Sequence, residues 1–319
     1  MKYNKLINLI KIITLYMNAL DVRLTRDLDT KRYYLWRGLL GFMKREAGQN
    51  IAKNFDPDGL IDESDFSEKL NEARNYVEEK LNGRKILSPK IEDIDENNKR
   101  ITKLYNEPTF KEHTIGMLSR YKVAMVELGK LHVFQPFLNE EYIDELSKKF
   151  EKLNGNDEEA LFKFCLPLRE EVEKHLANAS FNPVTNTFSL VTENLDFRII
   201  GNVNGTDPIT GRTFFGFAFG SGLPQMSIVK FKDFYFIKNG YHRAFALYKK
   251  KVKSAPFIVL ETDQFINTGA NQPGFFDYDT IYQYSPILED FDSKAALILP
   301  RRRLRAILSI HGEIQFLPI

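Results

Sequence analysis

Residues 231–261 have the sequence FKDFYFIKNGYHRAFALYKKKVKSAPFIVLE, and this stretch decides the fold. Ser227–Phe231 and Phe234–Ile237 are rich in β-branched and aromatic residues and are separated by two residues only, which predicts two strands joined by a tight hairpin. A turn at Asn239-Gly240 then leads into a helix that ends in three lysines, and Phe257–Leu260 is wholly apolar, as expected of a strand buried on both faces. The predicted order is strand, strand, helix, strand.

The turn before this helix has the chemistry of an anion site. Asn239 is a residue type favoured as a helix N-cap, and Gly240 lets a ligand approach the backbone closely. The N–H groups of the first helical turn lack intrahelical acceptors, and the positive end of the helix dipole lies behind them. His242 and Arg243 fall in that turn, where an imidazole and a guanidinium can both donate to phosphate oxygens. A plain helix cap with a structural histidine is the alternative interpretation.

Composition limits the classes of protein that this chain can belong to. Apolar residues make up 43% of the 319 residues, which predicts a folded chain and not a disordered one. Lys and Arg number 45 against 43 Asp and Glu, so the chain has almost no net charge to attract a polyanion. Any polyanion must therefore bind to a local patch of positive charge. Cys165 is the only cysteine, which excludes an intramolecular disulfide framework and favours a reducing, cytoplasmic location.

The N-terminal part of the chain is predicted to be helical. Apolar residues between Leu6 and Leu20 recur at spacings of three and four, which indicates a packed amphipathic helix and not a signal peptide. Further helices are expected at Thr30–Arg45 and Asp65–Leu81. No apolar run reaches the 18 or more residues of a membrane span, so no membrane partner is expected. We interpret residues 1–128 as a helical region that could present a surface to a protein partner.

The rest of the chain changes from helical to strand-rich character. Asn139 is expected to cap a helix, and Asp157–Leu176 to form another that Pro167 kinks or ends. After Asn182-Pro183, short aromatic and β-branched runs alternate with turn residues. The predicted fold class is therefore α+β, with a mixed α/β domain at 129–319 that carries inserted strands at about 151–225.

The segment 231–261 resembles the core of the ParB/sulfiredoxin superfamily. That core has a hairpin, a G-x-H-R type turn, a helix with small residues and a strand that opens with a Val-Pro-Val-like step, which here correspond to Gly240–Arg243, Ala244 and Ala246, and Ala255–Phe257. Leu131–Phe137 is similar to the family's opening strand with its Gln-Pro step.

The resemblance implies a nucleoside triphosphate, ATP or CTP, as the ligand, with Asn239, Gly240, His242 and Arg243 at its phosphates. It also implies a phosphotransferase or an NTP-hydrolysing switch, for which Glu140 and Glu141 are the first candidates to hold Mg²⁺ or to act as a base with His242. Tyr241 stands where a sulfiredoxin has its cysteine, so cysteine-dependent sulfinic acid reduction is not expected. The helix-turn-helix region of chromosome-partitioning ParB proteins is not found.

Two other kinds of function remain open. The densest positive cluster, formed by Arg301, Arg302, Arg303 and Arg305, suggests a nucleic-acid-binding protein or nuclease, such as a bacterial defence component, in which the turn grips a backbone phosphate. Because apolar residues interleave with these arginines, a half-buried terminal element is equally consistent with the pattern. A protein-interaction module with a vestigial site is the third hypothesis.

Other motifs in the chain carry less information. The glycine-rich stretch Gly216–Pro224 matches neither the Walker nor the Rossmann spacing, and Thr268–Gly274 has the composition of a surface loop. Asp196 and Asp207 are unranked candidates for a magnesium-binding carboxylate. The five histidines show no H-x-x-x-H spacing, so no metal site is predicted from them.

Overall fold

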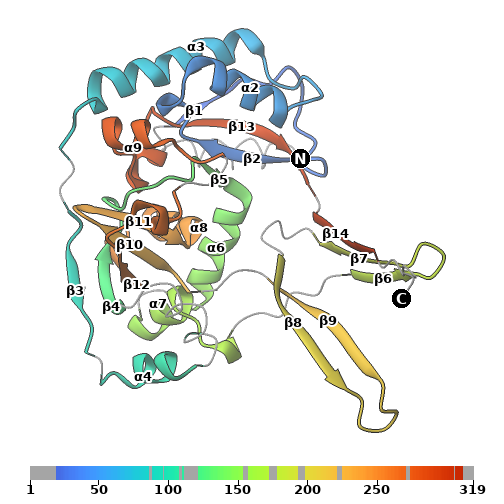
Figure 1. The fold of residues 1–319 in the computed structure, drawn as a ribbon. Coiled ribbons are helices and arrows are strands. Elements are labelled where there is room, and N and C mark those ends of the chain that lie inside the picture. Colours follow the sequence, from blue (N-terminus) through green and yellow to red (C-terminus); the bar gives the residue numbers. More distant parts are fainter. Residues whose placement is uncertain are drawn as a thin grey trace. The chain divides into compact units, whose positions relative to one another are not determined.

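The structure is a computed structural model of a mixed α+β chain (Figure 1). It describes residues 19–85, 88–95, 97–107, 110, 121–153, 157–171, 178–192, 198–220, 225–270, 274–304 and 306–311. The chain divides into two compact units. The first comprises Met1–Glu170 with Gln225–Arg302, and the second comprises Glu171–Pro224 with Arg303–Ile319.

A five-stranded sheet, in the order β11-β10-β12-β4-β3, forms the centre of the first unit. Its strands are β3 (Ile91–Asp93), β4 (Tyr121–Glu127), β10 (Ser227–Phe231), β11 (Phe234–Asn239) and β12 (Ser254–Glu261). Helix α8 (Tyr241–Lys249) connects β11 to β12, and β12 pairs parallel to β10 and antiparallel to β4. The predicted order of strand, strand, helix, strand is confirmed, and all six inner residues of β12 are buried as expected.

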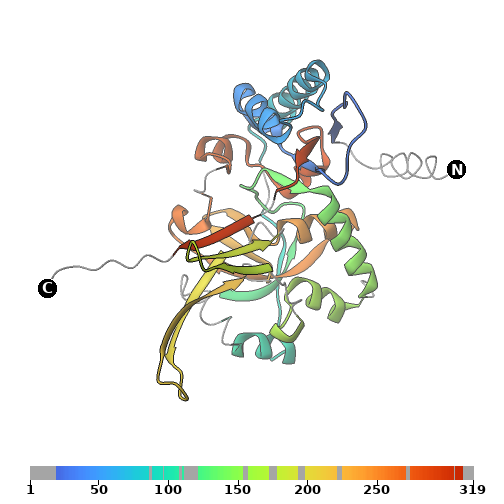
Figure 2. The same cartoon turned by 90° about the vertical axis from the view of Figure 1, so that its right-hand side faces the viewer.

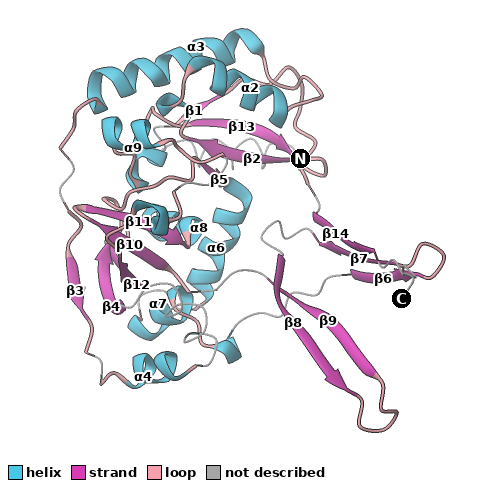
Figure 3. Cartoon of the chain, viewed as in Figure 1, coloured by secondary structure: helices cyan, strands magenta, loops and turns pink. Residues whose placement is uncertain are grey.

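A four-stranded sheet, in the order β1-β13-β2-β5, belongs to the same unit. Its strands are β1 (Leu20–Asp21), β2 (Tyr33–Gly38), β5 (Phe137–Asn139) and β13 (Leu297–Arg302). Helices α2 (Arg45–Phe55) and α3 (Glu63–Tyr76) pack beside it (Figures 1 and 3). The helix predicted at Thr30–Arg45 is wrong, because Tyr33–Gly38 pairs along its length with β13 and a short 3₁₀ turn, η2 (Leu40–Phe42), follows it.

The boundary predicted at residue 128 does not separate two folding units. β4 precedes that position, yet it lies inside the five-stranded sheet next to β12, while β2 pairs with β13 from the other end of the chain. These long-range pairings cannot be read from local patterns, because strand partners are chosen by tertiary packing. The expected amphipathic helix at residues 6–20 falls almost entirely outside the described residues.

The remaining helices of the first unit largely follow the sequence patterns. Asn139 caps α6 as predicted, since its Oδ1 accepts the N–H of Tyr142 at 3.0 Å. Helix α7 ends at Cys165, two residues before Pro167. The other bounds are η3 (Val77–Leu81), α4 (Lys99–Asn106), α6 (Glu140–Lys152), α7 (Glu158–Cys165), η5 (Arg169–Glu171, reaching the unit boundary), η6 (Phe265–Thr268), α9 (Tyr278–Tyr284) and η7 (Leu288–Asp292).

The second unit contains strands only among its described residues beyond Glu171. Strands β14, β7 and β6 form a three-stranded sheet, and β8 and β9 form a two-stranded hairpin (Figure 2). Their bounds are β6 (Asn178–Asn182), β7 (Thr187–Thr192), β8 (Arg198–Thr206), β9 (Thr213–Gly220) and β14 (Ala306–His311). The strand-rich segment predicted within 151–225 therefore exists, and it forms a unit of its own together with the C-terminal strand.

Candidate functional site

Gly240, and not Asn239, is the N-cap of helix α8. Gly240 has φ +97°, a left-handed conformation, and a Cβ placed there would lie 2.6 Å from Cγ of Met226. Asn239 is the last residue of β11, and its Nδ2 donates to the carbonyl oxygen of Gln225 at 2.9 Å. The N-cap role predicted for Asn239 is thus wrong, because the reversal that starts the helix requires glycine one residue later. Asn239 instead holds the strand end in place.

His242 joins the beginnings of two helices. Its Nε2 accepts the backbone N–H of Asn139, the N-cap of α6, at 3.0 Å, so the N-termini of α6 and α8 meet at this ring. Burial lowers the pKa of His242 to about 4, and the nearby Glu140 opposes that shift only in part. The imidazole is therefore neutral at pH 7, and because Nε2 accepts, Nδ1 carries the proton and can donate it.

Arg243 contacts the end of helix α7. One guanidinium nitrogen donates to the carbonyl oxygens of Phe164 at 3.2 Å and Cys165 at 3.4 Å. A cation at a helix C-terminus satisfies carbonyls that have no intrahelical donor and complements the helix dipole. Burial lowers the pKa of Arg243 and raises that of the neighbouring Cys165 thiol to about 12. Arg243 thus has a positioning role that the sequence did not predict.

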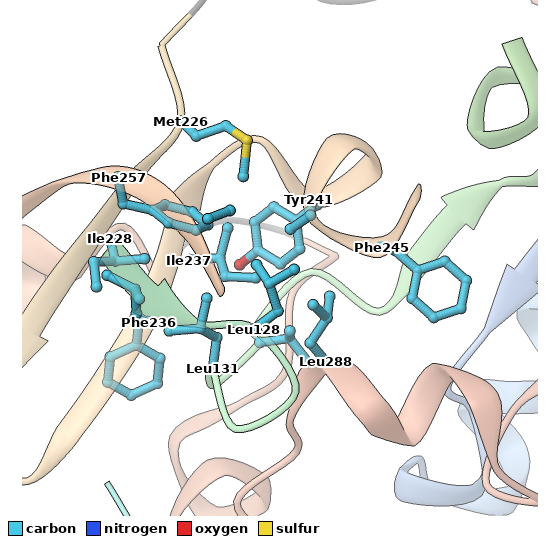
Figure 4. Packing of buried hydrophobic residues seen from close by; sticks show 14 of the residues in the cluster. Leu128, Leu131, Met226, Ile228, Phe236, Ile237, Tyr241, Phe245, Phe257 and Leu288 are labelled. Carbon is cyan, nitrogen blue, oxygen red and sulfur yellow. The ribbon is translucent and has the colours of Figure 1, made fainter. Parts of the chain in front are cut away.

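Tyr241 is buried beneath the turn. Its ring lies among Met226, Ile237 and Phe257 (Figure 4), and its hydroxyl oxygen lies 3.4 Å from the backbone nitrogen of Phe134. Burial raises the pKa of this hydroxyl. Tyr241 is therefore an aromatic residue that anchors the helix to the core.

Glu140 is the carboxylate nearest to this turn, and it belongs to a buried ion-pair network. Arg37 on β2 is fully buried. Its Nε donates to Glu140, and one of its terminal nitrogens donates to the carbonyl oxygen of Phe291 at 2.7 Å. Lys249 on α8 lies 3.6 Å from both Glu140 and Asp144. Sequence reasoning missed Arg37, whose only signal is an arginine inside an aromatic strand.

The structure thus places Glu140 near His242. The carboxylate of Glu140 is already paired with Arg37. Glu141, the second predicted carboxylate, is partly exposed on the first turn of α6.

Lys238 is a further cation at the turn that the sequence analysis did not single out. It lies on β11, two residues before Gly240, and is half-buried. Burial lowers its pKa, and no carboxylate within the described ranges offsets that effect. An anion that binds nearby would stabilise the charged form of such a lysine. The signal in the sequence is the lysine within Lys238-Asn239-Gly240, immediately before the turn.

The arginines at 301–305 fall in different parts of the structure. The guanidinium of Arg301 lies between the rings of Trp36 and Phe55, at 4.4 and 4.5 Å from their centroids. Arg302 is exposed at the end of β13, Arg303 belongs to the second unit, and Arg305 lies outside the described residues. Arg301 therefore packs against aromatic side chains within the first unit.

The other candidates from the sequence have ordinary structural roles or lie outside the description. Asp207 accepts hydrogen bonds from Ile209 N–H and Thr210 Oγ1 in the turn of the β8–β9 hairpin, which lowers its pKa. Asp196, residues 221–224 and residues 271–273 are outside the described ranges. A shallow hollow of about 300 Å³ on the five-stranded sheet contains the ion pairs Lys230–Glu261 and Lys122–Asp93, which neutralise one another.

Leu131–Phe137, predicted as an opening strand, is extended without forming one. His132 makes single bridges to Phe236 and Ile287, and its buried Nδ1 accepts the N–H of Tyr235 at 3.3 Å. Burial lowers the pKa of His132 to about 4. Only the last residue of the segment enters a strand, β5, in the other sheet.

The described residues include no group of three or more His, Cys, Asp or Glu side chains arranged to hold a metal ion. Within the same ranges, no helix has both the length and the apolar character needed to cross a bilayer. Comparison of the chain with protein-family models, curated proteins and solved structures finds no match.

Proposed function

We propose that the chain binds the phosphates of a nucleoside triphosphate, ATP or CTP, at the turn between β11 and α8. The observation that carries this proposal is the hydrogen bond from Asn139 N–H to His242 Nε2, because it brings the positive ends of two helices to one ring. A helix N-terminus favours anions through both its free N–H groups and its dipole. The strand, turn, helix and strand around it agree with the order expected of a ParB/sulfiredoxin-like core.

Three kinds of donor would hold the phosphates. The backbone N–H groups of the first turn of α8 supply directional bonds, Nδ1–H of His242 supplies one more, and Lys238 supplies a charge. Gly240 supplies the left-handed backbone turn that starts the helix. Mg²⁺ would accompany the phosphates. Phosphoryl transfer or hydrolysis requires a base, and Glu140 would act as one only after release from Arg37.

Thermal unfolding with ATP, CTP, GTP and UTP, each with and without Mg²⁺, tests the proposal. We expect one nucleotide to raise the melting temperature of the chain. His242→Gln should preserve an acceptor for Asn139 N–H while moving the N–H donor away from the position of Nδ1, and Lys238→Gln should remove the charge. Each should weaken binding about ten- to a hundred-fold, since a hydrogen bond to a charged group contributes roughly 1.5–3 kcal/mol.

Lys230→Gln is the matched control, because Lys230 lies on the neighbouring strand and is paired with Glu261 away from the turn. It should leave nucleotide binding unchanged. Arg243→Ala is unsuitable as a test, since it also releases the end of α7. A melting temperature that no nucleotide changes, or a shift that survives both turn variants, would show that the turn is not a nucleotide site. Stabilisation by DNA or RNA alone would favour the nucleic-acid alternative instead.

A further inference from the structure

The strands of the second unit are almost free of charge. In β6, β7, β8, β9 and β14 the only Asp, Glu, Lys or Arg is Arg198, whereas 28% of the whole chain is charged. Strand β9 has the sequence TFFGFAFG, with four phenylalanines and no charge at all. Depletion of charged residues is the compositional mark of the centre of a protein interface.

The described side chains of these strands contribute little buried apolar surface. Of the side chains that the structure describes in the second unit, Leu190 is the only buried apolar one. Large apolar side chains lie exposed instead on both of its sheets, with Phe181 at 59%, Ile307 at 67% and Phe214 at 51% of their full surface. A concentration of exposed apolar groups of this kind marks an interaction surface.

Among the described residues, β8 and β9 form a sheet of two strands only. The two strands pair with each other from Arg198–Gly220 to Thr206–Thr213, and no third strand within the described ranges pairs with either. A two-stranded hairpin alone is marginally stable in water. Natural edge strands usually carry a lysine, another charged residue or a proline, which prevents pairing with other chains. Strand β8 has Arg198 at its start, but β9 has none of these protections.

We propose that the β9 edge binds the β9 edge of a second copy of this chain, which extends the hairpin into a four-stranded antiparallel sheet. A two-fold interface must be complementary to itself, and like charges on it would oppose each other across the axis. An edge without charge avoids that repulsion. Antiparallel pairing of a strand with its own copy also satisfies the open N–H and C=O groups on both sides.

Two other occupants fit the surface less well. Binding to an anionic lipid surface or to nucleic acid draws on lysine and arginine beside the apolar groups, and β8 and β9 hold only Arg198. The turn between the strands carries Asp207 and Arg212, whose charges cancel.

The mass of the full-length chain in solution, measured by light scattering over a range of concentrations, tests the proposal. We expect twice the chain mass at high concentration. Ala218→Lys, which places a charge in the middle of β9, should return the mass to that of one chain. Ile209→Lys is the matched control, since Ile209 is exposed in the turn outside both strands, and this variant should remain dimeric.

A cysteine scan identifies the edge itself. Because the native Cys165 is buried, single variants Gly216→Cys, Phe217→Cys and Ala218→Cys report on β9. The residue nearest the two-fold axis should form an intermolecular disulfide under mild oxidation, and Ile209→Cys should not. A single-chain mass at every concentration, a dimer that Ala218→Lys leaves intact, or binding of the monomer to lipid vesicles in place of dimerisation would each overturn the proposal.

Discussion

The two units of the chain are both rich in strands, but they are stabilised in different ways. In the first unit, helices cover the sheets, the central strand β12 is buried along its inner length, and even Arg37 is buried with a charged partner. In the second unit, strands pair in regular register while Leu190 is the only buried apolar side chain described. Strand-forming residues therefore pair into sheets in both units, but among the described residues only the sheets of the first unit are covered by helices and enclose a core.

The largest effect on stability is expected at Arg37. Arg37→Ala leaves Glu140 without its buried partner and the carbonyl of Phe291 without a donor. Breaking a buried ion pair from one side destabilises a protein by about 3–5 kcal/mol. Urea unfolding of the first unit, followed by Trp36 fluorescence, should show this loss.

The double variant Arg37→Met with Glu140→Leu distinguishes the loss of the ion pair from the cost of leaving Glu140 buried without a partner. Replacing both partners by apolar groups is often neutral, so we expect it to recover most of the loss. A double variant as unstable as Arg37→Ala would mean that Arg37 acts through its other contacts.

The next largest effect on stability is expected at Gly240, and Gly211 of the second unit serves as the comparison. Gly240→Ala forces a side chain into the left-handed region and against Met226, so we expect a loss of roughly 2–4 kcal/mol from the combined strain and overpacking. Gly211, in the turn between β8 and β9, has φ +68°, but a Cβ added to it would meet no atom within 4 Å. Gly211→Ala should lose only about 1 kcal/mol. Calorimetric unfolding of both variants measures the difference, and equal losses would contradict the role given to Met226.

Local sequence patterns predicted the helices and strands whose signals are local. They failed where a strand depends on a partner far away in the sequence. The hairpin, α8 and β12 follow from alternation, turn residues and an apolar run, all of which are local. Tyr33–Gly38 was predicted as helix because its partner β13 lies more than 250 residues further along the chain. The roles of Arg243 and Arg37 were likewise missed, since the carbonyls of Phe164, Cys165 and Phe291 have no signature in the sequence.

Acid should destabilise the first unit through its buried histidines. The folded-state pKa of His132 is about 4, below its ordinary value of 6.5, so the unfolded chain takes up the proton first. Stability should therefore fall as the pH drops from about 6.5 to about 4, by roughly 1–3 kcal/mol for a shift of this size. His242 contributes in the same direction.

His132→Asn tests this origin of the acid sensitivity. The asparagine oxygen can replace Nδ1 as the acceptor for Tyr235 N–H, but it does not titrate. Urea unfolding at pH 7.5 and pH 5 should show a smaller difference between the two conditions than in the unchanged chain. The protection of the β11 amides against hydrogen exchange, relative to the intrinsic rate at each pH, should fall first on acidification, because β11 pairs with His132. An identical pH dependence in the variant would assign the effect to other groups.

The smallest effect is expected when a valine of the second unit is changed. Val203 lies on β8 with 49% of its surface exposed, while Val229 on β10 is fully buried, and both are strand residues. Val→Thr keeps the shape of the side chain and replaces one methyl group by a hydroxyl, which is unfavourable only where water is absent. Val229→Thr should destabilise the chain by about 1–3 kcal/mol, whereas Val203→Thr should change its stability by less than about 0.5 kcal/mol. Chemical unfolding at a low protein concentration measures both. If Val203→Thr is as harmful as Val229→Thr in the single chain, then this face of the hairpin is already covered, and the contrast between a unit with a core and a unit without one fails.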